Sequence, residues 1–139
     1  MTVKLKNFAI QNILDVLGEI SQQELSDIKI SYRIGKVIKA LSTHSEDYQE
    51  SRKKLIEQHA KKDKDGVILK ATDKDGNEIE DSVQLKDQEQ FNADILKILN
   101  DEVEVQIPIE LTVDELFEAE VKLKPHRVVM LEPIFSGGE

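Results

Sequence analysis

Apolar residues recur with a helical period in the first twenty residues of the chain. Asn7 is a residue type that often caps helices, and the apolar positions after it are spaced i, i+4, i+7, i+8 and i+11. They are Ala9, Ile13, Val16, Leu17 and Ile20. Because this spacing puts them on one face, it predicts an N-terminal helix that is capped by Asn7, weakens at Gly18 and gives way to a loop at 21–23.

The pattern changes twice in the next stretch. Residues 27–31, DIKIS, alternate polar and apolar positions and predict an extended segment. From Ser31 the period is helical, and neither Pro nor Gly interrupts it after Gly35. One face carries Ile34, Val37, Ile38, Leu41, Ser45, Tyr48, Arg52, Leu55 and His59. A helix over 31–62 would be roughly 48 Å long, so we expect part of it to project or to pack against a partner.

The four letters DKDG occur at 63–66 and again at 73–76. An EF-hand loop would need ligands at its positions 1 and 12 around a central Gly. If Gly66 is position 6 these places hold Lys61 and Thr72, and if Gly76 is position 6 they hold Ala71 and Ser82. Asp-Gly is a strong turn pattern. The first copy is therefore predicted to end the long helix, and the second to reverse a polar hairpin between VILKAT and a strand within 78–85.

A second helix and a strand follow. Asp87 with Gln90 resembles a capping box, and Phe91, Ile95, Ile98 and Leu99 predict an amphipathic helix over 88–100. Residues 102–110, EVEVQIPIE, alternate strictly and predict a half-buried strand with a wet, acidic face. Pro108 lacks a donor, which places it on an edge or at a strand end.

The last part of the chain predicts two short helices. Thr112 with Glu115 is a second capping-box candidate before 113–118, and Pro125 suits the first position of a helix to Leu131. The predicted fold is therefore α+β in one domain, 1–139. Within it we distinguish a basic helical part (1–62), an acidic α+β part (63–135) and a loose tail (136–139).

Charge is distributed unevenly along the chain. Residues 1–62 hold 11 Lys/Arg and 8 Asp/Glu, whereas residues 63–139 hold 8 and 20, within a net charge of −9. Such an acidic protein repels free nucleic acid, so direct nucleic-acid binding is not expected. Aromatic residues make up only 4%, so the core must rely on Ile, Leu and Val, and a homo-oligomer is a natural way to bury more apolar surface.

Few residues suggest chemistry. The chain has no Cys, and His44, His59 and His126 show no metal-binding spacing. No GxSxG, P-loop or GxGxxG motif is present. We therefore expect no enzyme activity, no catalytic residues, no metal and no cofactor. The first residues, MTVKLKNFAIQNILDV, lack the apolar run of a signal peptide, and no stretch reaches the ~20 apolar residues of a membrane span.

Two charged groups are candidates for protein contact. Lys29, Arg33, Lys36 and Lys39 run along the start of the long helix. They fit a solvated face, a phosphate contact or, as the preferred functional interpretation, an acidic protein surface. Glu102 and Glu104 share one face of the strand. They fit a solvated acidic face, a divalent-ion or acid–base pair, or a protein-binding surface that mimics phosphate charge.

Several segments in order resemble a family of small phage and prophage proteins of unknown function, often found among tail-region late genes. The pattern comprises IKISYRIGKVIKAL continuing as YQESRKKLIEQHAKKD, then the DKDG region, FNADILKILNDEVEVQIPI, and a final LKPHRVVMLEPI. The resemblance implies a phage origin, a location in the host cytoplasm during infection or in the virion, and a non-catalytic role.

These observations leave three functional hypotheses. The first is a phage protein acting through protein–protein contact, as a minor tail or neck component or an assembly factor. The second is an accessory protein whose acidic surface binds and inhibits a host enzyme or defence system. The third is a metal-dependent hydrolase using the carboxylates around Glu102 and Glu104.

Overall fold

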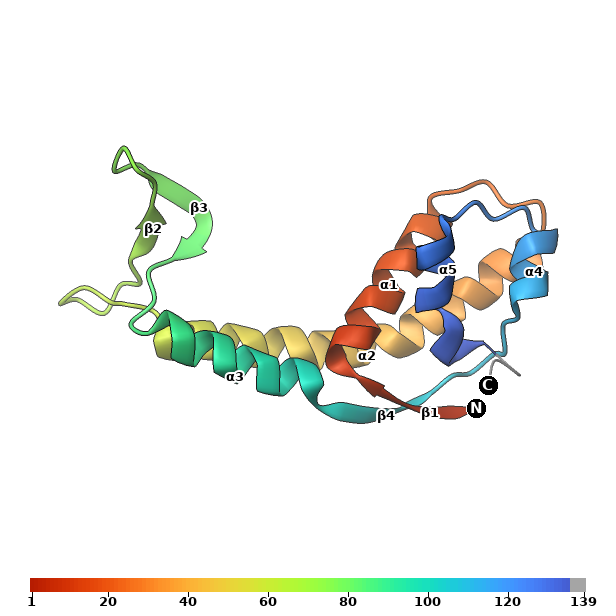
Figure 1. Cartoon of the computed structure of the whole chain (residues 1–139), viewed down its shortest axis with the longest axis horizontal. Coiled ribbons are helices and arrows are strands. Elements are labelled where there is room, and N and C mark those ends of the chain that lie inside the picture. The colour runs from red at the N-terminus through yellow and green to blue at the C-terminus, as the bar shows by residue number, and fades with distance from the viewer. Residues whose placement is uncertain (136–139) are drawn as a thin grey trace. The chain divides into compact units, whose positions relative to one another are not determined.

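The computed structural model describes residues 1–135, with the side chains of all of them except Glu80 and Asp81. The predicted loose tail, 136–139, lies outside the described residues. The α+β class is confirmed, because helices dominate and the strands form two small antiparallel sheets (Figure 1). The expected N-terminal helix, long helix, polar hairpin, amphipathic helix, acidic edge strand and short C-terminal helix are all present.

Packing divides the chain into two compact units. Unit 1 comprises Met1–Asp47 and Asn100–Glu139, described up to residue 135, and unit 2 comprises Tyr48–Leu99. The change from basic to acidic composition at 62/63 falls inside unit 2, because packing follows apolar contacts and not net charge. The prediction that residues 1–139 form one domain stays a prediction.

The sheet of unit 1 pairs the two ends of the sequence. Strand β1 (Thr2–Lys6) runs antiparallel to β4 (Glu102–Gln106), with Leu5 opposite Val103 and Val3 opposite Val105. β4 is shorter than the predicted 102–110. Backbone pairing continues one residue past it, because the Ile107 N–H donates to the Met1 carbonyl at 2.8 Å and the Met1 amino group donates to the Ile107 carbonyl at 3.2 Å, and the next residue, Pro108, cannot donate. The alternation is confirmed beyond the strand end: Val105 and Ile107 are buried, and Glu102, Glu104, Gln106 and Pro108 are exposed.

Helix α1 (Asn7–Ser21) follows β1 directly. It begins at Asn7, so the predicted cap is wrong: Lys6 is the N-cap residue. The backbone N–H of Asn7 instead donates to the carbonyl of Asp101 at 3.0 Å, because β1 holds the helix start against the turn before β4. The predicted apolar face is confirmed, with Ile10 added to it.

Helix α2 (Ile28–His59) begins three residues before the predicted start. The extended segment at 27–31 is therefore wrong. The Asp27 carboxylate accepts from the Lys29 N–H at 2.9 Å, and its carbonyl accepts from Ile30 and Ser31 at 3.2 and 3.3 Å. A short alternating run does not distinguish strand from helix, and the Asp27 cap decides for the helix.

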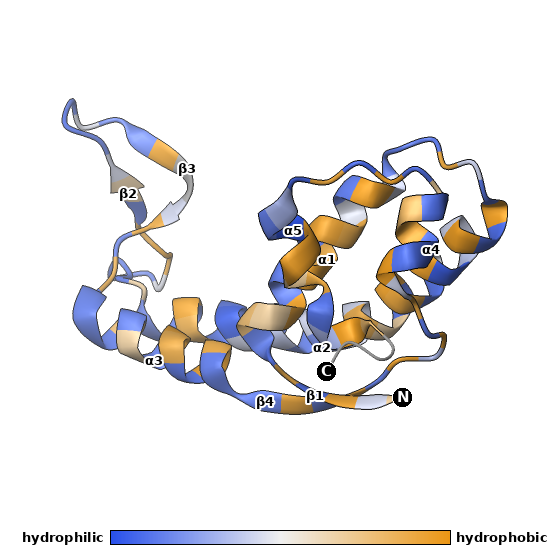
Figure 2. Ribbon diagram, turned by 45° about the vertical axis from the view of Figure 1, so that its right-hand side comes forward, coloured by the Kyte–Doolittle hydropathy of each residue, from blue (hydrophilic) through white to orange (hydrophobic). Residues whose placement is uncertain are grey.

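The core of unit 1 collects apolar side chains from α1, the start of α2, both strands and the C-terminal segments. Helix α4 (Val113–Glu118) and helix α5 (Pro125–Met130) match their predictions, and one 3₁₀ turn (Glu132–Ile134) follows. Figure 2 shows hydrophobic residues on α1, α4 and α5 of this unit, and hydrophobic and hydrophilic residues alternating along the β1–β4 sheet. The largest fully buried side chains include Ile10, Ile13, Leu17, Ile20, Ile34, Leu41, Leu111, Leu131 and Ile134.

Unit 2 contains the rest of α2, two successive reverse turns and helix α3 (Gln88–Asn100) except its last residue. Strand β2 (Lys70–Thr72) pairs with β3 (Glu78–Val83), and the second DKDG turns this hairpin as predicted. The first DKDG does not end the long helix. α2 stops at His59, and DKDG reverses a smaller hairpin in which Lys62 bridges to Ile68.

The two DKDG turns are built alike. In each, the leading Asp carboxylate (Asp63 or Asp73) accepts from backbone N–H groups two and four residues later, at 2.9 and 3.0 Å. Gly66 and Gly76 follow with φ of 82° and 83°, a conformation that glycine adopts without steric cost. The repeat thus has a turn-forming role in both copies.

Candidate protein-contact surface

The start of α2 presents an apolar pair to solvent. Ile28 and Tyr32 lie one turn apart, and they are 84% and 61% exposed. The buried face of this segment is carried by other positions, namely Ile30, Ile34, Val37 and Leu41. Since large side chains at i and i+4 share one helix face, Ile28 and Tyr32 form an apolar spot that unit 1 does not cover.

The predicted basic group surrounds this spot, with one exception. Lys29, Lys36 and Lys39 are exposed, and the Lys36 Nζ lies 5.5 Å from the centroid of the Tyr32 ring, within cation–π range. Arg33 is only half-buried and forms an ion pair with Glu115 of α4. The structure therefore separates three cations facing solvent from one that joins two helices.

Helix α4 is short but bonded at both ends. The Thr112 hydroxyl accepts from the Glu115 N–H at 3.1 Å, which confirms the predicted cap. At the other end Glu120 has φ of 61°, and the N–H groups of Glu120 and Val121 donate to the carbonyls of Phe117 and Leu116 at 3.0 and 3.1 Å. This is a Schellman ending with a non-glycine residue in the left-handed region, where a side chain is disfavoured.

These two ends hold a second apolar pair in solvent. Val113 and Phe117 are again one turn apart, and they are 50% and 81% exposed. Leu116 and Ala119 point into the core instead. The Arg33–Glu115 ion pair joins α2 to α4. We define the α2/α4 surface as Ile28, Lys29, Tyr32 and Lys36 of α2 together with Val113, Asp114, Phe117 and Glu118 of α4.

The α2/α4 surface is hollowed beside the α2 pair. This hollow measures about 540 Å³ and is lined by Ile28, Lys29, Tyr32, Arg33 and Ile109. A smaller hollow of about 130 Å³ lies beside Phe117 and is lined entirely by apolar side chains. The larger hollow therefore combines apolar side chains with the cations of Lys29 and Arg33, whereas the smaller one has no charged residue in its lining.

Glu102 and Glu104 have a different environment from the one their sequence context predicts. The β1–β4 register puts Glu102 directly opposite Lys6 and Glu104 directly opposite Lys4. Directly opposed residues lie on the same face of a sheet, and opposite charges there stabilise the pairing modestly. The wet face of β4 is therefore part of a mixed-charge ladder, and the structure does not bring these carboxylates together with the basic residues of α2.

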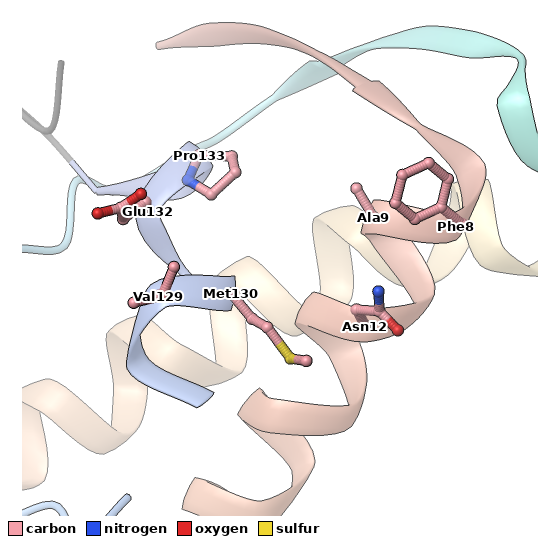
Figure 3. A pocket seen from close by; sticks show the side chains of 7 residues that line it. All are labelled: Phe8, Ala9, Asn12, Val129, Met130, Glu132 and Pro133. Carbon is pink, nitrogen blue, oxygen red and sulfur yellow. The ribbon is translucent and has the colours of Figure 1, made fainter. Parts of the chain in front are cut away.

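A cavity of about 430 Å³ lies between α1 and the C-terminal segments (Figure 3). Phe8, Ala9 and Asn12 come from α1, and Val129 and Met130 come from α5. Glu132 and Pro133 complete the lining. The only polar side chains among these seven residues are one amide and one carboxylate, so the lining offers no pair of nucleophile and base.

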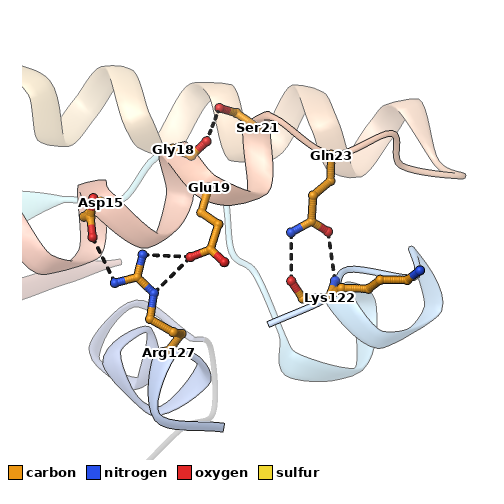
Figure 4. A network of polar contacts seen from close by, with 7 residues as sticks. All are labelled: Asp15, Gly18, Glu19, Ser21, Gln23, Lys122 and Arg127. Carbon is orange, nitrogen blue, oxygen red and sulfur yellow. Dashed lines mark hydrogen bonds and ion pairs between the residues drawn. The ribbon is translucent and has the colours of Figure 1, made fainter. Parts of the chain in front are cut away.

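A polar network near this cavity has a structural role (Figure 4). Arg127 of α5 donates to Glu19 at 2.7 and 2.9 Å and to Asp15 at 2.9 Å. Hydrogen bonds to Glu19 first, and then to Asp15, raise the pKa of Arg127. Gln23 exchanges two hydrogen bonds with the backbone of Lys122, at 2.8 and 2.9 Å. Together these contacts fasten the segment 122–127 to α1 and the residues after it.

The histidines do not converge. His59 of unit 2 shares a hydrogen bond of 2.8 Å with Asp94, and its ring meets Phe91 edge to face. Among the side chains that the structure describes, which do not include those of Glu80 and Asp81, no group of three or more His, Asp or Glu is arranged to hold a metal ion. Within residues 1–135, no helix combines the length and the apolar character needed to cross a bilayer.

Comparison with known proteins gives no relative. No protein-family model, no curated protein and no solved structure matches the chain. The site must therefore be judged from its own residues.

Sequence reasoning missed the four apolar residues of the α2/α4 surface. The alternation at 27–31 predicts an extended segment, in which Ile28 would share a face with Ile30. If residues 28–41 form one helix, Ile28 and Tyr32 lie outside the buried stripe of Ile30, Ile34 and Val37. The helical spacing of these residues in the sequence is sufficient to predict this. Phe117 could be found in the same way, because a six-residue helix that buries Leu116 turns the next residue outward.

Proposed function

We propose that this chain acts through protein–protein contact at the α2/α4 surface, without catalysis. The observation that carries the proposal is the exposure of Phe117, at 81%, on a helix whose two ends are fixed by hydrogen bonds. Burying a Phe side chain is worth roughly 1.5–3 kcal/mol. A rigid element that leaves this side chain in water is suited to bury it against a partner.

The composition of the surface supports the same function. Tyr32 and Phe117 are aromatic, and interface energy concentrates in a few aromatic and Arg residues surrounded by polar ones. Lys29, Lys36, Asp114 and Glu118 supply such a polar rim. The arrangement is that of an interface with a small apolar centre.

The resemblance to small phage proteins supports a role of this contact in particle formation. On this proposal the chain is a minor tail or neck component or an assembly factor, located in the infected cell and in the particle.

The experiment is mass spectrometry of purified phage particles and of assembly intermediates, taken from infected cells that produce either the wild-type chain or a variant. We expect the wild-type chain in at least one of these fractions, and we expect Tyr32→Ala/Phe117→Ala to be lost from it. Val67→Ala is the matched control, because Val67 is also an exposed apolar residue but belongs to unit 2. Absence of the wild-type chain from both fractions would contradict the proposal.

The second candidate, an inhibitor of a host enzyme, is favoured by one observation. Residues 100–121 contain eight carboxylates and no Lys or Arg, which is the charge of a surface that could occupy a nucleic-acid groove. The pairing of Glu102 and Glu104 with Lys6 and Lys4 weakens that surface. A pull-down from host lysate with wild type and with Asp114→Lys/Glu118→Lys tests it: charge-dependent capture of a nucleic-acid enzyme supports inhibition, and capture of phage structural proteins alone refutes it.

A further inference from the structure

The α2/α4 surface has two halves of opposite charge. The α2 half combines Ile28 and Tyr32 with Lys29 and Lys36, and the four side chains are all exposed. The α4 half combines Val113 and Phe117 with Asp114 and Glu118, which are likewise exposed. Each half is thus an apolar pair on one helical turn with two like charges beside it.

The Arg33–Glu115 ion pair keeps these halves next to each other in one molecule. A two-fold axis between them would lay the α2 half of one copy on the α4 half of a second copy, and would do so twice. Such an interface is isologous, and it needs a patch that is complementary to itself. We propose that a second copy of this chain binds the α2/α4 surface in this way. The inference rests on the proposed function, since it names the partner of the same surface.

The apolar groups fit this arrangement. Phe117 protrudes from α4, and the hollow of about 540 Å³ beside Ile28, Tyr32 and Ile109 lies on the other half of the surface. In the two-fold pair, Phe117 of each copy enters the hollow of the other and meets Tyr32 there. Aromatic pairs of this kind add to the area that they bury.

The charges of the α2/α4 surface favour a second copy of the chain over a protein whose surface is uniformly acidic or uniformly basic. A uniformly acidic protein would meet Lys29 and Lys36 favourably but would face Asp114 and Glu118 with like charge, and a uniformly basic protein would suffer the reverse. Like charges that face each other across an interface repel and so suppress wrong partners. A copy of the same chain carries both signs at the required positions.

The test is sedimentation equilibrium of the full chain and of two charge-swap variants. Lys29→Glu/Lys36→Glu makes both halves acidic, and Asp114→Lys/Glu118→Lys makes both halves basic. We expect a dimer for wild type with a dissociation constant at or below about 100 μM, as for weak specific interfaces. Each variant alone is expected to be monomeric, and an equal mixture of the two is expected to form a heterodimer, because every contact then joins opposite charges.

Two controls separate the interface from general effects. Lys62→Glu/Lys64→Glu has the same net charge as the first variant but changes exposed residues of unit 2, so it should dimerise like wild type. Phe117→Ala removes no charge and should weaken the dimer about thirtyfold or more, as loss of a central aromatic anchor does. Circular dichroism of each variant checks that the helices are retained.

A wild type that stays monomeric at chain concentrations above about 100 μM would overturn the inference. Charge-swap variants that dimerise alone, or that are folded but fail to form a heterodimer, would overturn it too. Particle incorporation reports separately on the proposed function. If the wild type is monomeric but Tyr32→Ala/Phe117→Ala is still lost from particles, the surface binds a different protein and only the second-copy partner is refuted.

Discussion

Helices α1 and α3 carry similar apolar patterns but end up in different surroundings. α1 of unit 1 buries Ile10, Ile13, Val16, Leu17 and Ile20, all of them almost completely. α3 of unit 2 has its own i, i+4, i+7, i+8 series, yet no residue of α3 is fully buried. The pattern therefore predicts a helix and its inner face, while the depth of burial depends on what else the fold supplies to cover that face.

Unit 1 can cover its helices because it draws on segments far apart in the sequence. β1, β4, α4 and the C-terminal residues all contribute to one apolar cluster. Among the described residues of unit 2, only Tyr48 and Ala60 are buried hydrophobic residues. Since local stability follows buried apolar contact, unit 1 should be the stable part of the molecule and unit 2 the part that opens first.

The largest difference is expected when one leucine in each unit is replaced by alanine. Leu17→Ala removes a fully buried side chain and should lower the free energy of unfolding by about 2–5 kcal/mol. Leu99→Ala removes a partly buried one and should cost about 1 kcal/mol. Urea unfolding gives the free energies, and amide hydrogen exchange assigns each loss to its unit. Equal losses would show that unit 2 has a core as complete as that of unit 1.

A smaller effect is expected from glycine replacements in the two units. Gly66 has φ of 82°, so Gly66→Ala should destabilise the first turn of unit 2 by about 1 kcal/mol. Gly18 lies within α1, and a Cβ there would meet nothing within 4 Å. Gly18→Ala should therefore stabilise unit 1 by about 0.5–1 kcal/mol. Thermal unfolding of both variants measures the signs, and a stabilising Gly66→Ala would contradict the turn geometry.

The elements that sequence reasoning predicted well are those with their own local chemistry. Thr112 and Glu115 bracket α4, Pro125 opens α5, and Asp87 accepts from the Gln90 N–H at 3.1 Å at the start of α3. Each start depends on a side chain within three residues of it. Such bonds form wherever the segment lies in the fold, so the printed sequence contains what is needed to predict them.

The errors occurred where distant contacts decide. Asn7 could serve as a cap, but the pairing of β1 with β4 sets the helix start one residue earlier and directs the Asn7 N–H to Asp101. The carboxylates Glu102 and Glu104 suggested an acidic face because nothing in the local sequence reveals that Lys6 and Lys4 lie opposite them. In both cases the partner is about 95–100 residues away in the sequence. A local pattern of polar and apolar residues does not predict contacts over that separation.

The candidate surface shows the same division. Lys29, Lys36 and Lys39 were recognised from their spacing on a helix, and they are exposed as expected. The spacing does not predict the ion pair of Arg33, because its partner Glu115 belongs to another helix. The exposure of Phe117 depends on which side of α4 the core occupies, and only the assembled unit 1 determines that.

The smallest expected effect concerns pH and unit 2. Asp94 accepts from Gln90 at 2.9 Å and shares a hydrogen bond of 2.8 Å with His59. These bonds, the one to Gln90 first, lower the pKa of Asp94 below its ordinary value of 3.8. Because the folded pKa is depressed, the contribution of Asp94 to stability is present above the unfolded value and is lost as pH falls through the folded one.

Asp94→Asn should therefore destabilise unit 2 at neutral pH, and its difference from wild type should shrink as pH is lowered below about 4. Hydrogen exchange of α3 amides at a series of pH values, corrected for intrinsic rates, reports the difference within unit 2. Asp65→Asn is the control for loss of one carboxylate, since Asp65 is an exposed residue of the first DKDG turn in the same unit. A gap between Asp94→Asn and wild type that stays constant down to low pH would mean that the Gln90 and His59 bonds do not favour the charged carboxylate.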